Sequence, residues 1–354
     1  MTAVPAALQT RATELFGVRY PVVQTGMGWV SGPRLTAATA NAGGLGILAS
    51  ATMTYDELAA AIRDTKTRTR APFGVNLRAD AVDAVARVEL LATEGVRVAS
   101  FALAPTQDLI KRCKDHGLVV VPSIGARRHA EKVAAWGVDA VIVQGGEGGG
   151  HTGQVPTTVL LPQVVDAVDI PVIAAGGFFD GRGLVAALAY GAAGIAMGTR
   201  FLLTSDSAVA ASVKSVYLSH DVTGTVVTTE VDGLPHRVLR TEFVDQLVRS
   251  RALGRLARAV KNAVAFQKLS GVGWKDVAQE GLAMRKNAEL SVSQLVMAAN
   301  APMLLKAAMV DGRPDLGVMA SGQVVGVIDD LPSCQELIDR IVAEATAVLS
   351  RLGR

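Results

Sequence analysis

The sequence predicts an α/β protein built on a (β/α)8 barrel, with a mainly helical insertion over the C-terminal face of the barrel. Short apolar runs rich in β-branched residues alternate with alanine-rich stretches through the first two-thirds of the chain. The runs are continuously apolar, as expected for strands buried on both faces of a parallel sheet. Eight such alternations close most naturally into a barrel, because an open doubly wound sheet usually has fewer strands in one unit.

Each predicted strand is one of these apolar runs, and each connection between them is predicted to be helical. Connections such as DELAAAIRD and GRGLVAALAYG have apolar residues at helical spacing, and glycines lie near the C-terminal ends of several of them. In chain order the strand runs are PVVQTG, LGILA, FGVNL, VASFAL, LVVVPSI, AVIVQGG, PVIAAGG and GIAMGTRFL.

The alternation stops after residue 204, which predicts three parts of the chain. Residues 1–204 form the barrel, residues 205–311 form a helical insertion or lid, and residues 312–354 return to the barrel. The insertion is basic in its middle, and the last part ends in a long amphipathic helix. Long connections at the C-terminal face are where barrel enzymes carry their functional residues.

The composition excludes several classes of protein. Half of the residues are hydrophobic and 19% are charged, so the chain can bury a large core. The net charge of +3 and the lack of an aromatic-basic stripe argue against nucleic-acid binding. No apolar run reaches the roughly 18–20 residues of a membrane span, and the start does not resemble a signal peptide. The two cysteines suit a reducing compartment, so we expect a cytoplasmic protein.

Glycines follow the last two predicted strands. Gly176 and Gly177 follow the first of these strands, and Gly198, with Thr199 directly after it, follows the second. Backbone N–H groups without side chains in the way can bind phosphate, and these two loops are the common phosphate site of the architecture. The alternative is that the glycines only form tight turns. Two such loops in succession favour a phosphate site, although neither the dinucleotide-binding nor the Walker pattern is present.

His151 is the only histidine at a predicted strand end, within the glycine-rich loop 144–153. An imidazole titrates near neutral pH, and the flanking glycines let the backbone approach a ligand, so His151 is the candidate acid–base residue. The alternative is an exposed loop histidine without a role. We expect Glu147, in the same loop, to have a structural role such as capping a helix.

The other chemically active side chains indicate less. No cluster of histidine, cysteine and carboxylate residues has metal-ligand spacing, so we expect no metal. No nucleophile elbow or activated cysteine is present. His116 and His129 fall in predicted barrel helices and are expected at the surface, whereas His220 and His236 fall in the insertion and remain unassigned.

Five segments together resemble the nitronate monooxygenase family and its relatives, the flavin-type enoyl-ACP reductases. The resemblance covers almost the whole barrel and the C-terminal part, and it implies an FMN-binding TIM barrel. The segments are QTGMGWVSGPRLTAATANAGGLGIL, PFGVNL, GGEGGGHTG, PVIAAGGFFDGRGLVAALAYGAAGIAMGTRF and ASGQVVG.

The same resemblance implies the roles of individual residues. His151 matches the active-site histidine of the family, and the glycine pairs after the last two strands would hold the FMN phosphate. Residues from the strand ends, from the glycine loop and from a C-terminal motif would line the rest of the cofactor. The implied cofactor-binding residues are Gln24, Gly26, Met27, Asn76, Gln144, Gly149, Gly150, Gly176, Gly177, Gly198, Thr199, Ser321, Gly322 and Gln323.

Within the family, the chain is most similar to an actinobacterial branch that acts on coenzyme A thioesters in steroid-ring breakdown. Members of that branch put a double bond into the ring of a hydroxy-methyl-oxo-octahydro-indene-carboxyl-CoA, which implies an acyl-CoA substrate and leaves room for NAD as electron partner and for a homodimer. Three alternatives stay open: a nitronate monooxygenase that uses O2, a flavin-type enoyl thioester reductase, and a non-catalytic flavin- or phosphate-binding barrel.

Basic residues crowd one stretch of the insertion, although the chain as a whole is nearly neutral. Arginine binds phosphate oxygens through charge-assisted hydrogen bonds, so the stretch is a candidate site for the phosphates of coenzyme A. The alternative is a solvated helix face. The residues are Arg237, Arg240, Arg249, Arg251, Arg255, Arg258, Lys261 and Lys268.

Overall fold

The computed structural model describes residues 5–102, 104–249 and 300–353, and its centre is a closed barrel of parallel strands. β1 pairs with β9 as well as with β2, which closes the sheet. The eight strands are those that the apolar runs predict, and nearly all of their residues are buried. They are β1 (Val22–Gln24), β2 (Leu45–Ala49), β3 (Gly74–Leu77), β4 (Val98–Phe101), β5 (Val119–Ile124), β6 (Val141–Gln144), β8 (Val172–Ala175) and β9 (Gly194–Met197).

Helices surround the barrel, as the sequence predicts. Their ends follow local sequence signals: Thr54 and Glu57 form a capping box at the start of α3, and Asp180 caps α8 through the N–H of Gly183. The barrel helices are α2 (Pro33–Asn41), α3 (Tyr55–Arg68), α4 (Ala84–Thr93), α5 (Gln107–Asp115), α6 (Arg127–Ala135), α7 (Thr157–Val165) and α8 (Gly181–Ala189).

The two ends of the chain complete the barrel. After η1 (Ala6–Leu8), α1 (Arg11–Phe16) contributes Ala12 and Phe16 to the same apolar cluster as inward-facing strand residues. α16 (Cys334–Leu352) packs on α8 and α2, so it takes the place of the last barrel helix. The long amphipathic helix expected at the C-terminus is therefore present, and it contacts the barrel.

The part between β9 and α16 contains strands as well as helices. α9 (Thr199–Leu202), α10 (Ala211–Leu218), α11 (Glu242–Arg249) and α15 (Asn300–Met309) are its described helices. β10 (Thr225–Thr228) and β11 (His236–Leu239) form an antiparallel hairpin that the largely helical pattern does not predict. The predicted boundaries at residues 204/205 and 311/312 remain predictions.

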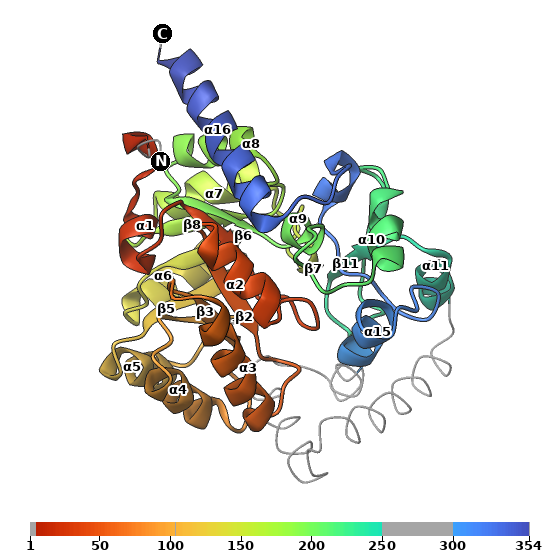
Figure 1. The fold of residues 1–354 in the computed structure, drawn as a ribbon, viewed down its shortest axis with the longest axis horizontal. Helices are drawn as coiled ribbons and strands as arrows, with labels where there is room; N and C mark the ends of the chain where they lie inside the picture. The colour runs from red at the N-terminus through yellow and green to blue at the C-terminus, as the bar shows by residue number, and fades with distance from the viewer. Residues whose placement is uncertain (1–4, 103, 250–299, 354) are drawn as a thin grey trace.

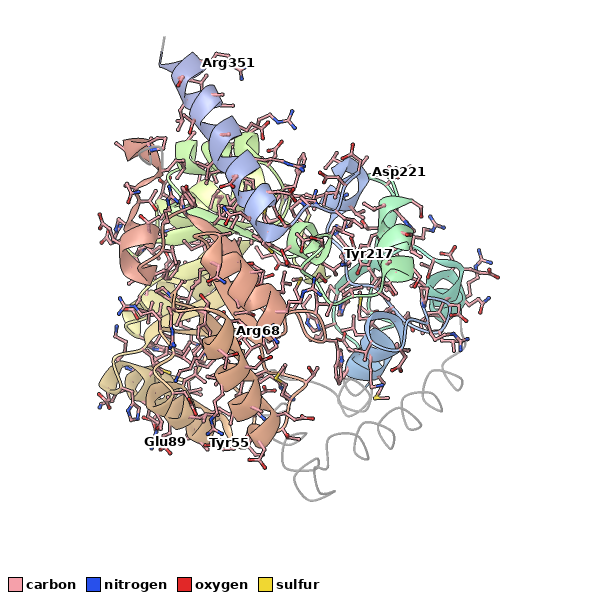
Figure 2. The ribbon with its side chains drawn as sticks, viewed as in Figure 1. Tyr55, Arg68, Glu89, Tyr217, Asp221 and Arg351 are labelled. Atoms are coloured by element: carbon pink, nitrogen blue, oxygen red, sulfur yellow. The ribbon has the colours of Figure 1, made fainter. Side chains whose placement is uncertain are left out.

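The hairpin attaches this part to the C-terminal face of the barrel. β11 pairs with β7 (Gly150–His151), which belongs to the glycine loop after β6, and Val238 forms a bridge with Ala320. Tyr217 of α10 is fully buried, and its hydroxyl donates to the carbonyl of Ala320 at 2.8 Å (Figure 2). The part between β9 and α16 is thus anchored to the loops at the barrel mouth (Figure 1).

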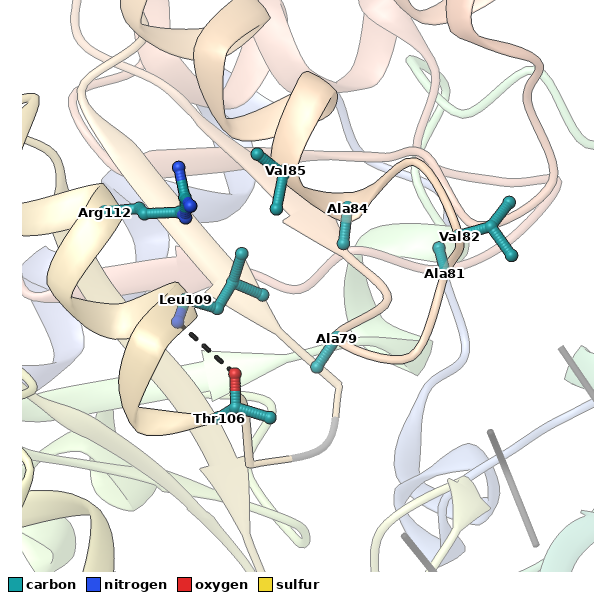
Figure 3. Close-up of a pocket in the computed structure, with 8 residues that line it drawn as sticks. All are labelled: Ala79, Ala81, Val82, Ala84, Val85, Thr106, Leu109 and Arg112. Carbon is teal, nitrogen blue, oxygen red and sulfur yellow. Dashed lines mark hydrogen bonds between the residues drawn. The ribbon is translucent and has the colours of Figure 1, made fainter. Parts of the chain in front are cut away.

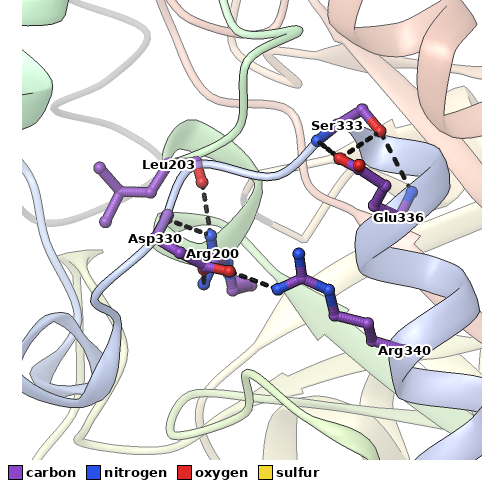
Figure 4. A network of polar contacts seen from close by, with 6 residues as sticks. All are labelled: Arg200, Leu203, Asp330, Ser333, Glu336 and Arg340. Carbon is purple, nitrogen blue, oxygen red and sulfur yellow. Dashed lines mark hydrogen bonds and ion pairs between the residues drawn. The ribbon is translucent and has the colours of Figure 1, made fainter.

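A buried arginine fixes the path from the C-terminal motif to α16. Arg200, directly after Thr199, pairs with the Asp330 carboxylate at 2.9 Å and donates to the carbonyls of Leu203 and Asp330 (Figure 4). Arg340 of α16 pairs with the same carboxylate. η2 (Gln323–Val327) lies on this path.

Within the described residues, no helix combines the length and the apolar character that crossing a bilayer requires.

Candidate active site

The glycine loop after β6 is packed too tightly for side chains at several positions. A Cβ on Gly145 would lie 2.0 Å from Thr157 Oγ1, and one on Gly149 would lie 2.5 Å from the backbone of Ser321. Gln144 donates from its amide to the carbonyl of His151 at 2.8 Å, which holds the loop in a closed turn. The glycines therefore let the loop contact both α7 and the C-terminal motif.

Glu147 has the structural role that the sequence predicts. Its carboxylate accepts from the backbone N–H of Thr157 at 2.9 Å and from the Thr157 hydroxyl at 2.7 Å. Thr157 is the first residue of α7, where unpaired N–H groups and the helix dipole favour an anion. Glu147 therefore caps α7 and is not part of an acid–base pair with His151.

His151 lies in β7, at the edge of the three-stranded sheet. Its Nε2 lies 2.7 Å from Oδ2 of Asp232, and its ring centroid lies 4.7 Å from that of His236. The His151 side chain is 56% exposed, whereas those of Asp232 and His236 are 5% and 4% exposed. The site is thus an accessible imidazole backed by a buried carboxylate and a second, buried imidazole.

Burial and charge act on the three groups in opposite directions. Burial lowers the pKa of His151, but the hydrogen bond and charge of Asp232 outweigh it and leave the pKa above its ordinary value. Burial dominates at His236 and lowers its pKa. Although burial alone would raise the pKa of Asp232, the hydrogen bond to His151 and the neighbouring His236 ring hold it below its usual range. At neutral pH, Asp232 is therefore ionised and His236 is neutral.

The same three side chains are also arranged closely enough to be considered as metal ligands. Their ligand atoms all lie within 4.8 Å of one another, a grouping that sequence spacing does not reveal. Two ligands of a tetrahedral zinc ion at about 2.0–2.1 Å would be separated by roughly 3.3 Å. The 2.7 Å between His151 Nε2 and Asp232 Oδ2 is instead a hydrogen-bond length, which favours a hydrogen-bonded pair.

The predicted phosphate residues meet at one place on the barrel mouth. Gly176 and Gly177 have φ values of +89° and +87°, which favour glycine. A Cβ on Gly177 would meet only the Glu147 side chain, at 3.8 Å, so the backbone there is open. Gly198 precedes the first turn of α9, and Thr199 begins it.

The C-terminal motif joins the segment after β9 to the glycine loop. The N–H of Gly322 donates to the Thr199 hydroxyl at 2.9 Å, and the N–H of Gln323 donates to the Glu147 carbonyl at 3.0 Å. Ser321 is fully buried, and its N–H donates to the Arg237 carbonyl. Residues that are far apart in sequence are thus brought together.

The residues at the end of β1 pack against Asn76 of β3. Gln24 is fully buried and donates to the Ser31 hydroxyl at 2.9 Å, while its Oε1 has no partner among the described residues. A Cβ on Gly26 would overlap Asn76, at 2.5 Å, so the two segments touch. The N–H of Met27 also donates to the Ser31 hydroxyl, at 2.9 Å.

The chain also matches a known protein family. The family model described as nitronate monooxygenase matches residues 9–86 and 79–344. The chain belongs to the nitronate monooxygenase family. It is therefore an oxidoreductase of that family.

Two members of the nitronate monooxygenase family with a more specific name are similar over nearly the whole chain. Both are named (3aS,4S,5R,7aS)-5-hydroxy-7a-methyl-1-oxo-octahydro-1H-indene-4-carboxyl-CoA dehydrogenase. The protein of Mycobacterium tuberculosis is 67% identical and covers 96% of both chains. The protein of Rhodococcus jostii is 62% identical and covers 98% of this chain and 99% of its own. Among solved structures, FabK from Thermotoga maritima has a TM-score of 0.79 and 33% identity, over 97% of this chain and 98% of its own.

One part of this family member that sequence reasoning singled out has another role. Arg237, in β11, donates to the Gly146 carbonyl at 2.8 Å and to the Thr225 hydroxyl at 2.9 Å, so it supports the glycine loop. Arg240 is exposed and pairs with Asp245 at 3.2 Å. Arg249 ends α11. The rest of the basic stretch, from Arg251 to Lys268, lies outside the described residues.

Sequence reasoning missed Asp232 and left His236 unassigned, yet both touch the candidate active-site histidine of this family member. Asp232 and His236 lie in the segment VDGLPH, which contains a turn signal followed by a histidine. Asp232 is 81 residues after His151, so no local pattern links the two. Only the pairing of β7 with β11 brings the segments together. His116 and His129, in contrast, are exposed as predicted.

A shallow hollow of about 180 Å³ lies away from these residues, between the loop after β3 and helices α4 and α5 (Figure 3). Of the described residues that line it, Arg112 alone is charged, and the others are small or apolar apart from Thr106. Thr106 caps α5 by accepting from the N–H of Leu109 at 3.3 Å. The described residues that line the hollow include no carboxylate, histidine or cysteine, so they offer none of the acid–base groups gathered around His151.

Proposed function

We propose that this chain is an FMN-dependent dehydrogenase that introduces a ring double bond into a steroid-derived hydroxy-methyl-oxo-octahydro-indene-carboxyl-CoA. The observation that carries the proposal is the identity of 67% and 62%, over nearly full length, to two dehydrogenases named for that acyl-CoA. Because activity resides in a site and not in a fold, the residues at the barrel mouth must also suit the reaction.

The loops after β8 and β9 fit the phosphate of FMN. At Gly177 an added Cβ would meet only the Glu147 side chain, at 3.8 Å, among the described residues, and Gly198 and Thr199 start a helical turn after the neighbouring strand. Among the described residues the buried Oε1 of Gln24, at the C-terminal end of β1, has no partner, and as an acceptor it would suit an N–H of the flavin and not the phosphate. When bound, FMN would supply the hydride acceptor that a dehydrogenation requires.

His151 would act on the substrate. The hydrogen on the carbon beside a thioester carbonyl is the acidic one, so its proton must pass to a base while hydride leaves the neighbouring carbon. An exposed imidazole with a raised pKa is suited to take that proton. The nearby buried groups, Asp232 and His236, are too enclosed to reach a substrate themselves.

Two other functions each have one observation in favour. The match to the nitronate monooxygenase model favours oxidation of alkyl nitronates with O2, with His151 handling the proton. The similarity to FabK favours an enoyl thioester reductase, which would use the same residues for the reverse reaction with a reduced nicotinamide as donor. The dehydrogenase is preferred because its relatives are about twice as similar in sequence.

Three further parts of the proposal concern partners. The acyl-CoA phosphates would bind the basic stretch beyond Arg249, because a diphosphate and a 3′-phosphate need cationic groups. NAD is the proposed electron partner that reoxidises the cofactor. A homodimer is the proposed assembly, and its test is the mass of the protein in solution.

Anaerobic reduction of the bound flavin distinguishes the functions. We expect the indene-carboxyl-CoA to bleach the flavin absorbance in one turnover, whereas an alkyl nitronate does not. Oxygen consumption with the nitronate, without bleaching by the acyl-CoA, would replace the proposal by the monooxygenase. Bleaching by NADH followed by recovery with an enoyl thioester would favour the reductase. A protein that holds no flavin after reconstitution would contradict all three.

A further inference from the structure

We propose that Asp232 is the positioning residue for His151, that His236 shields their contact, and that Nδ1 of His151 is the atom that meets the substrate. The inference rests on the proposed function, which assigns His151 to proton transfer. It adds two residues and a specific ring nitrogen to that assignment. Both residues come from the insertion and not from the barrel.

Asp232 is held rigidly from both of its oxygens. Oδ1 accepts from the backbone N–H of Leu234 at 3.2 Å, in the turn that leads into β11. Oδ2 faces the histidines, at 2.7 Å from His151 Nε2 and 3.5 Å from His236 Nδ1. A carboxylate fixed in this way can hold an imidazole in one orientation, because the Asp232 side chain does not rotate when the imidazole moves.

The hairpin places His151 over this carboxylate. In the antiparallel pairing of β7 with β11, His151 is directly opposite His236, and Gly150 is opposite Arg237. The N–H of Thr152 donates to the Pro235 carbonyl at 3.2 Å, which extends the pairing past His151. The Arg237 guanidinium holds the Gly146 carbonyl in the same loop. The loop that carries His151 is therefore fastened on both sides of that residue.

His236 is placed to exclude water from the pair. Both of its ring nitrogens are buried and have no hydrogen-bond partner within residues 5–102, 104–249 and 300–353. Its ring packs against that of His151 at a tilt of 48°. Asp232 and His151 are the charged or titratable groups that act on it, and burial keeps it neutral. A neutral ring here strengthens the hydrogen bond beside it, because that bond weakens in water.

The contact decides which nitrogen is reactive. A carboxylate can only accept, so Nε2 of His151 carries the hydrogen and the lone pair of the neutral ring is on Nδ1. The proton from the substrate carbon therefore goes to Nδ1, and the resulting imidazolium is stabilised by the adjacent anion. This is the logic of an aspartate that orients a catalytic histidine in hydrolases, here on a different fold.

The test compares Asp232→Asn with a matched control, Asp221→Asn. Asp221 also accepts from the N–H of a residue two positions later, Thr223, at 2.7 Å, but it is outside the site. We expect Asp232→Asn to keep its flavin and to slow anaerobic flavin reduction by the acyl-CoA by about 10²-fold or more, towards the ~10⁴-fold of comparable aspartate changes. Asp221→Asn should leave the rate unchanged.

The pH profile separates positioning from a merely structural role. His151 must be neutral to accept a proton, so the rate rises with pH through its pKa. Without the anion that raises this pKa, the rise moves to lower pH in Asp232→Asn, while the plateau falls. Asp232→Glu, which keeps the charge, should restore the position of the rise. A lower plateau with no shift would overturn the proposal.

A measurement on the unchanged protein serves if Asp232→Asn does not fold. The nitrogen chemical shifts of His151 in the flavin-loaded protein report its neutral tautomer, and we expect hydrogen on Nε2. Hydrogen on Nδ1 would contradict the inference, as would a stoichiometric divalent metal on the three side chains. If His151→Ala reduces flavin normally, the role of His151 in the proposed function fails; if only the Asp232 variants are normal, this inference alone fails.

Discussion

The phosphate region and the histidine region of the barrel mouth are built in different ways. Gly176 and Gly177 follow a barrel strand directly, and their positive φ values are local requirements that only glycine meets without strain. His151 lies in β7, His236 begins β11 and Asp232 lies in the turn before it, so these residues meet through the pairing of two strands of a separate small sheet. A local motif can be read from a sequence, whereas a site assembled by long-range pairing cannot.

Replacing the exposed member of the histidine region should have the largest effect. His151→Ala removes the acid–base group and is expected to slow flavin reduction by about 10²–10⁴-fold, with flavin content unchanged. Stopped-flow absorbance measures both. His129→Ala, at an exposed helix position, is the control. Loss of flavin in His151→Ala would mean that the histidine region also holds the cofactor, and would contradict the separation of the two regions.

Replacing a glycine of the phosphate region should affect the cofactor and not the chemistry. Gly177→Leu places a side chain where phosphate is expected, so flavin content after purification should fall by about tenfold or more. Gly137→Leu is a matched control, since its φ of +89° imposes the same strain but no atom of the described residues lies within 4 Å of a Cβ added there. Both variants should lose about 1–2 kcal/mol of stability. Equal flavin content in the two would refute the phosphate site.

Neutralising the basic stretch should have a smaller effect, confined to the substrate. Changing Arg251, Arg255 and Arg258 together to Gln is expected to weaken acyl-CoA binding by about tenfold and to flatten its salt dependence. Titration calorimetry at two salt concentrations measures this. The same change at three exposed barrel arginines, Arg63, Arg68 and Arg127, serves as the control. Unchanged acyl-CoA affinity at low salt would contradict this site and favour the nitronate monooxygenase hypothesis.

The smallest expected effect is on stability. Because the pKa of His151 is raised in the folded protein, its ion pair with Asp232 stabilises fully below the ordinary pKa of histidine and is lost as pH rises through the folded value. His151→Ala should therefore destabilise the protein more at pH 5.5 than at pH 9. The difference is at most about 1 kcal/mol, since solvent screens a half-exposed histidine. Thermal unfolding at both pH values tests the sign.

The fold and the candidate phosphate region follow largely from local patterns. The apolar runs predict all eight barrel strands, and glycines with positive φ mark the loop after β8. The helix-capping role of Glu147 was also predictable, because an acidic residue near a helix start has a physical reason to be there. The hairpin β10–β11 was not predictable in the same way, since its surroundings in sequence read as helical.

What the sequence determined by itself is thus the barrel, the order of its elements and the histidine that faces solvent. Only the folded structure shows that a carboxylate and a second imidazole contact that histidine. Asp232 and His236 precede and begin a strand whose register with β7 sets their distance to His151. Strand period and helix capping act between neighbours in the chain, whereas register depends on which distant edge a strand meets, and nothing local to either segment specifies that.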